Sequence, residues 1–177
     1  MHALHKILVR INGDGIHDSD GMDREEIMDD ARYTAASATE GFNQAYDWRE
    51  TDTAGRWDDV YPENVLLSSD NIDSFIGEIL DCKSKQQAEI DVCVKRIKEG
   101  LGSMDLQSII DRNTDTIRDY SLLYELKLIA ELLSGEYVFD SMFFDADYYT
   151  AKITDDTINK VKQSPNDWAL VMFDCHI

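Results

Sequence analysis

The two most strand-like segments of the chain lie at its two ends. In residues 3–11, the apolar residues Ile7, Val9 and Ile11 alternate with other residues, which is typical of a half-buried strand. Residues 168–173 read WALVMF, a short and continuously apolar run typical of a buried strand. Because a strand needs partners, we expect these two to pair at the centre of a small antiparallel or mixed sheet.

Between the ends, apolar residues recur every three or four positions, the period of an amphipathic helix. The pattern predicts a helix within 22–44 and another over 70–99, which at 1.5 Å per residue is roughly 45 Å long. Residues 83–89 are polar all round, so the second helix either breaks there or projects from the body. We expect helical structure to extend over 70–134, and Thr154 to cap a short helix before the final strand. The sequence thus predicts an α+β fold with long amphipathic helices packed on one face of the sheet.

The composition fits one domain that covers residues 1–177. The chain has only two prolines and no Gly/Ser-rich run, so we expect no flexible linker. No apolar run approaches the roughly 18–20 residues that cross a bilayer, and the N-terminus lacks the apolar core of a signal peptide. Cys82, Cys93 and Cys175 form no CxxC pair and are expected to be buried, reduced thiols. We therefore expect a cytoplasmic protein.

Charge is the feature that bears most on function. The chain holds 36 Asp and Glu against 17 Lys and Arg, a formal net charge of −19, beyond the roughly 2–8 that solubility needs. The acids concentrate in three blocks, residues 14–30, 40–63 and 136–156, whereas residues 83–98 are basic. A directional anionic surface of this kind favours cationic partners and repels nucleic-acid phosphates.

The segment 12–23 is the densest group of oxygen ligands, and it fails as an EF-hand calcium loop. Placing Gly21 at the sixth position puts Ile16 at the first and Ile27 at the twelfth, where carboxylates are required. Short Asp residues also suit a turn that leads into a helix, with Asp20 or Asp23 as the cap. A looser magnesium or calcium site formed by Asp14, Asp18 and Asp20 remains an alternative.

No catalytic signature is present. The chain has no GxxxxGK[ST], GxGxxG or GxSxG motif, and Cys175 and His176 point to opposite faces if they share a strand. His5 and His176 could meet if the terminal strands pair, but two imidazoles do not make a zinc site. We therefore expect no enzyme activity and no cofactor.

Residues 137–149 combine six aromatic residues with Asp140, Asp145 and Asp147. One interpretation is a pair of core strands with acids on the exposed side. The other is a protein-binding patch, in which Tyr and Phe supply contact area and Asp complements a basic partner.

In charge and size, with the acids concentrated in those three blocks, the chain resembles small acidic anti-defence proteins of phages and mobile elements, of the anti-CRISPR and antirestriction type. The C-terminal residues 167–176 (DWALVMFDCH) also look like the end of uncharacterised mobile-element proteins from gut-dwelling Gram-positive bacteria. Nineteen charges equal those on roughly 32 Å of duplex DNA, so the resemblance implies a DNA-mimicking inhibitor.

Our leading hypothesis is a non-enzymatic inhibitor of a basic nucleic-acid-binding nuclease, without direct contact to nucleic acid or membrane. The alternatives are a metal-dependent enzyme or metal-stabilised domain at the 14–23 loop, and a structural or adaptor homodimer formed through residues 70–99. The residues predicted to contact the partner are all carboxylates: Asp14, Asp18, Asp20, Asp23, Glu25, Glu26, Asp29, Asp30, Asp140, Asp145 and Asp147.

Overall fold

The first and last strands pair along their whole length. The computed structural model describes residues 2–11, 23–40, 48–102, 126–127, 129–131, 134 and 143–176. Within it, β1 (His2–Arg10) and β5 (Trp168–His176) are antiparallel, in a register that runs from His2 opposite His176 to Arg10 opposite Trp168. The pairing predicted from the two ends of the chain is confirmed.

Three short strands complete a mixed, five-stranded sheet. β4 (Phe143–Asp145) runs parallel to β1 on its free edge. On the other edge of β5, β2 (Trp48–Glu50) and β3 (Val65–Leu67) each form an antiparallel pair with it, at different positions along the strand. The strand order is β2-β5-β1-β4 with β3 beside β5, so β1 and β5 are central and the fold is α+β.

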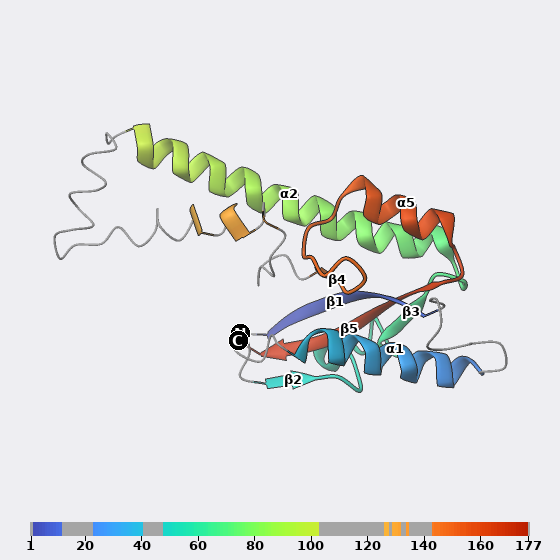
Figure 1. Cartoon of the computed structure of the whole chain (residues 1–177). Helices are drawn as coiled ribbons and strands as arrows, with labels where there is room; N and C mark the ends of the chain where they lie inside the picture. The colour runs from blue at the N-terminus through green and yellow to red at the C-terminus, as the bar shows by residue number, and fades with distance from the viewer. Residues whose placement is uncertain are drawn as a thin grey trace.

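Helices cover both faces of this sheet, which corrects the expectation that they lie on one face (Figure 1). α1 (Arg24–Ala38) packs on one face, and α2 (Ile72–Gly102) and α5 (Asp155–Gln163) lie on the other. The alternation of β1 explains the two layers, because successive side chains point to opposite faces. Ile7 and Val9 join the α1 core with Met28, Ala31 and Ala35, whereas Leu8 joins the α2 and α5 core with Phe75, Ile79, Ile158 and Val161.

α2 is one continuous helix, so the polar stretch 83–89 is not a break. Its middle is held by Gln86, whose buried side chain donates to the Ala151 carbonyl at 2.9 Å and accepts from the Ile153 amide at 3.2 Å. A polar residue therefore occupies an inward-facing position there because it satisfies two backbone groups. Further along, Cys93 is buried against Ile90 and Ile129. The helix expected in 103–125 lies outside the described residues.

Capping residues set the ends of the two shorter helices. Thr154 is the N-cap of α5, as predicted, and the helix ends before the Ser164-Pro165 step. α1 begins after Asp23 and ends at Ala38, earlier than the predicted 44. The hydroxyl of Thr39 donates to the Ala35 carbonyl at 2.7 Å and so satisfies the last turn.

The histidines adopt a different pairing from the one considered. The register places His2, rather than His5, beside His176, with ring centroids 4.8 Å apart. His5 faces the interior, and burial, with a smaller contribution from Arg49, lowers its pKa to about 3. All three cysteines are free and buried, as predicted. No helix in the described ranges is long and apolar enough to cross a membrane.

Candidate partner-binding surface

The first two turns of α1 carry five of the predicted partner-binding carboxylates, and two of the five also shape the helix. Asp23 accepts hydrogen bonds from the amides of Glu25 and Glu26, both at 3.0 Å. The Glu26 carboxylate accepts in return from the Asp23 amide at 3.0 Å, which completes a capping box. Negative charge here also suits the positive end of the helix dipole. Asp23, Glu25, Glu26 and Asp29 are exposed and Asp30 is partly exposed.

Two arginines of α1 connect these acids to the chain around β3. Arg24 forms ion pairs with Glu63 at 2.9 Å and with Asp70 at 2.8 Å. Its hydrogen bond with Glu63 and, as the next largest cause, its hydrogen bond with Asp70 hold its pKa above the ordinary arginine value. Arg32 pairs with Asp29 at 2.5 Å and donates to the Glu63 carbonyl at 2.8 Å. Arg24 is thus neutralised by Glu63 and Asp70, and Arg32 by Asp29.

Asn64 fixes the position of that second segment. It is buried with a positive φ of 45°, and its amide donates to the carbonyls of Thr51 and Met172 at 3.1 and 3.2 Å. Its side-chain oxygen accepts from Arg32 at 2.7 Å. Glu63 is therefore held beside α1 by the hydrogen bonds of its neighbour in sequence.

These contacts join parts of two acidic blocks, 14–30 and 40–63, into one surface. We call it the α1 acidic face; it carries seven carboxylates and two guanidinium groups, for a net formal charge of −5. Its acidic members are Asp23, Glu25, Glu26, Asp29, Asp30, Glu63 and Asp70. Sequence reasoning missed the last two as contact residues, because nothing in their spacing indicates that Arg24 reaches them.

Asp145 and Asp147 do not belong to this surface. Asp145 is fully buried and accepts from Lys160 of α5 at 2.7 Å, and Asp147 pairs with the same ammonium at 3.0 Å. Burial raises the pKa of Asp145, and the hydrogen bond from Lys160 opposes that shift. The Asp145 carboxylate is therefore part of the interior, and the prediction that it contacts a partner does not fit its position.

Each of the two interpretations of the aromatic segment 137–149 holds for some of its described residues. Phe143 and Phe144 are buried core residues of β4, whereas Tyr148 and Tyr149 are 55% and 64% exposed. The Lys160 ammonium lies 3.8 Å from the centroid of the Tyr148 ring. The core interpretation thus holds for the two phenylalanines, and the two tyrosines remain available on the surface.

The remaining predicted contact residues, Asp14, Asp18, Asp20 and Asp140, lie outside the described residues, as does the alternative metal site at the first three. Among the residues that are described, no group of three or more His, Cys, Asp or Glu side chains is arranged to hold a metal ion.

Two of the buried thiols are poorly suited to nucleophilic chemistry at neutral pH. Burial raises the pKa of Cys82, and it raises that of Cys175 to about 12. The thiolate is the nucleophilic form of cysteine, so both groups are kept in the unreactive form.

The basic stretch of α2 is partly neutralised within the chain. Lys83 pairs with Asp155 at 2.6 Å and Lys85 with Asp81 at 2.7 Å, whereas Lys95 and Lys98 are exposed further along the helix. These two lysines are carried by α2, which packs on the opposite side of the sheet from α1 (Figure 1). Comparison with known proteins finds no matching family model, no matching curated protein and no matching solved structure.

Proposed function

We propose that the protein is a non-enzymatic acidic interaction protein that binds a basic nucleic-acid-binding protein and inhibits it by occupying its nucleic-acid site. A nuclease of a CRISPR or restriction system is the partner class that this function implies. The observation that carries the proposal is the α1 acidic face, where acids from separate parts of the sequence lie side by side and neutralise the local arginines. The proposed function also requires a cytoplasmic location, where such nucleases act.

The density of charge on α1 supports mimicry of DNA. Asp23 to Asp30 spans seven residue steps of 1.5 Å, roughly 10 Å of helix axis, and carries five carboxylates. That is about one negative charge per 2 Å, or per 2–3 Å after subtraction of Arg24, against one per 1.7 Å of duplex DNA. A groove shaped for phosphates would therefore meet a comparable density of charge.

The separation of charge supports a defined orientation of binding. The α1 acidic face has a net formal charge of −5, whereas residues 88–102 of α2 hold three acids and three basic residues, and α2 packs on the other side of the sheet, so the negative field is stronger at α1. A basic partner would be steered toward α1 during encounter, and salt would slow that step.

The test is inhibition of DNA cleavage by a panel of purified CRISPR and restriction nucleases. We expect the protein to inhibit at least one of them, in competition with duplex DNA and less effectively as salt rises. The variant Glu25→Lys/Asp30→Lys reverses two charges on the face and should abolish inhibition. The matched control Asp91→Lys/Asp156→Lys makes the same change in net charge at exposed positions on α2 and α5, away from the face.

The two variants have equal net charges, so a difference between them reports the position of the reversed charges. If both variants lose inhibition equally, total charge and not the α1 acidic face drives binding. If the α1 variant inhibits as well as the unmodified chain does, the proposed surface is wrong.

A homodimer formed through α2 is a second candidate, favoured by two exposed apolar residues. Leu80 and Val92 are 45% and 47% exposed on this helix. Sedimentation of the unmodified chain and of a Leu80→Glu/Val92→Glu variant tests it, since a dimer formed through this helix should dissociate in the variant.

A further inference from the structure

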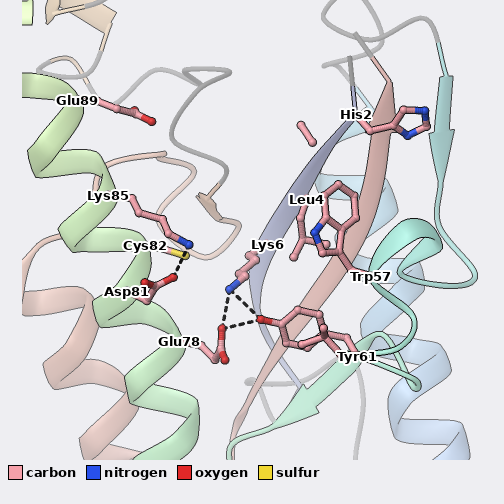
Figure 2. Close-up of a pocket in the computed structure, with 12 residues that line it drawn as sticks. His2, Leu4, Lys6, Trp57, Tyr61, Glu78, Asp81, Cys82, Lys85 and Glu89 are labelled. Atoms are coloured by element: carbon pink, nitrogen blue, oxygen red, sulfur yellow. Dashed lines mark hydrogen bonds and ion pairs between the residues drawn. The ribbon is translucent and has the colours of Figure 1, made fainter. Parts of the chain in front are cut away.

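A cavity of about 560 Å³ opens between β1, the segment that follows the 3₁₀ helix η2 (Gly55–Trp57), and α2 (Figure 2). Its position follows from the alternation of β1. Leu8 is buried beneath α2, and the next residues on the same side of the strand, Lys6, Leu4 and His2, line the cavity. Its volume lies within the roughly 300–1,000 Å³ of small-molecule sites.

An ionic cluster forms the floor of the cavity. The Lys6 ammonium lies 2.5 Å from the Glu78 carboxylate and 3.2 Å from the Tyr61 hydroxyl, which itself donates to Glu78 at 3.0 Å. Burial alone would lower the pKa of Lys6, but Cys82, Glu78 and Tyr61 outweigh it and raise the pKa above the ordinary lysine value. The floor is therefore a neutral pair in which the lysine already has its counter-ion.

Charged groups of both signs line the α2 side of the cavity. The described lining residues include the carboxylates of Glu78, Asp81 and Glu89 and the ammonium groups of Lys6 and Lys85. Both lysines pair with lining carboxylates, Lys6 with Glu78 and Lys85 with Asp81 at 2.7 Å. Among the described lining residues, no ammonium group is left over for an anionic ligand.

The Asp81–Lys85 pair is easily exchanged. Its side chains are 51% and 67% exposed, and exposed i,i+4 pairs contribute only about 0.3–0.5 kcal/mol. A ligand cation can therefore replace Lys85 beside Asp81 at little cost, whereas Lys6 is 7% exposed and stays in place.

The opposite wall is aromatic and apolar. Figure 2 shows Trp57 and Tyr61 beside Leu4, across the cavity from the charged row of α2. Aromatic faces attract cations, by about 0.5–1 kcal/mol at exposed sites and more where water is excluded. Lys6 already lies 5.3 Å from the Tyr61 ring centroid, so this wall accommodates an ammonium group within the chain itself.

We propose that this cavity binds a small organic cation, a primary ammonium or guanidinium group carried on a flat or apolar body. The cation pairs with Asp81 while the body packs against Trp57 and Leu4. The net charge of −19 raises the local concentration of cations and repels phosphorylated or carboxylate ligands. This site faces α2, away from the α1 acidic face, and does not depend on the proposed function.

Three probes of matched size test the proposal: phenethylamine, 2-phenylethanol and phenylacetate. Each is titrated into ¹⁵N-labelled full-length protein while the indole resonance of Trp57 is followed, with a Trp57→Leu variant to assign that resonance. We expect phenethylamine to shift it saturably, and the neutral and anionic probes to bind at least tenfold more weakly.

Two exposed substitutions separate recognition from folding. Asp81→Asn should weaken phenethylamine binding about twofold, the equivalent of one lost exposed ion pair. Asp155→Asn, which breaks an exposed Lys–Asp pair outside the cavity, should leave binding unchanged. The proposal is overturned if phenethylamine gives no saturable shift at millimolar concentration. Equal binding of phenylacetate or 2-phenylethanol, or an Asp81→Asn affinity equal to that of the unmodified chain, overturns it as well.

Discussion

The ion pair between Lys6 and Glu78 should respond very differently to the removal of one partner or the other. The Lys6 side chain is 7% exposed and that of Glu78 is 29% exposed. In Glu78→Gln, the ammonium remains buried without its counter-charge, because its position on β1 directs it toward α2. In Lys6→Met, an unbranched apolar side chain replaces the lysine stem, and the Glu78 carboxylate can turn toward the water-accessible cavity.

The expected magnitudes follow from these exposures. An uncompensated buried charge costs about 3–5 kcal/mol of unfolding free energy, and the partial exposure of Glu78 places Glu78→Gln near 3 kcal/mol. Lys6→Met removes the buried charge itself and should cost about 1 kcal/mol, as for other volume-conserving changes. The double variant should cost about the same as Lys6→Met alone, because no unpaired ammonium remains.

Urea unfolding of the four proteins measures this cycle, provided that the slope with urea is the same in all of them. If Glu78→Gln costs no more than Lys6→Met, the ammonium finds other solvation in the cavity and the buried-pair reasoning fails. A double variant as unstable as Glu78→Gln would also refute it.

Four further substitutions test separate parts of the fold. Since the pKa of His5 is lowered to about 3 in the folded chain from 6.5, the unfolded chain binds more protons at intermediate pH. Stability should therefore fall by about 2 kcal/mol between pH 7 and pH 5, and His5→Leu should flatten that slope in urea unfolding. Gln86→Leu leaves two buried backbone groups before α5 without partners and should cost about 2–4 kcal/mol in the same assay. Gly55→Ala places a Cβ at positive φ against the Asp174 carboxylate and should cost about 1–3 kcal/mol in thermal unfolding, whereas Gly77→Ala, in open space on α2, should stabilise the chain.

The larger elements of the fold are predictable because their signals are local. Residues 3–11 and 168–173 have strand periodicity and composition along most of their length, and they form the central pair. Thr154 is an N-cap that can be recognised in the sequence from its residue type. For such segments, local preference and tertiary structure agree.

The short strands and the register are not predictable from those signals. β2, β3 and β4 have three residues each, too few for a period to appear, and they exist because the edges of β1 and β5 need partners. The register depends on packing across the whole sheet, so the choice between His2 and His5 as the neighbour of His176 could not be made in advance.

The candidate surface, too, is predictable from sequence only in part. The acids of α1 are visible in sequence as a block, and the helix N-terminus predicts their exposure. The addition of Glu63 and Asp70 depends on the reach of Arg24, and the burial of Asp145 depends on Lys160 of α5. Both are tertiary contacts between distant segments. The cavity is of the same kind, since its three walls come from segments with no common motif.

Salt should act in opposite directions on the stability of this chain and on the proposed binding. A net charge of −19 destabilises the compact state by self-repulsion, so screening should raise the thermal midpoint. The same screening, with a Debye length that falls from about 10 Å at 0.1 M to about 3 Å at 1 M salt, should weaken a partner held by the α1 acidic face. If added salt abolishes binding while it raises the thermal midpoint, the chain is still folded when binding is lost. The loss is then electrostatic in origin. If the thermal midpoint falls together with binding, salt acts on folding, and the salt sensitivity of binding no longer supports the proposed surface.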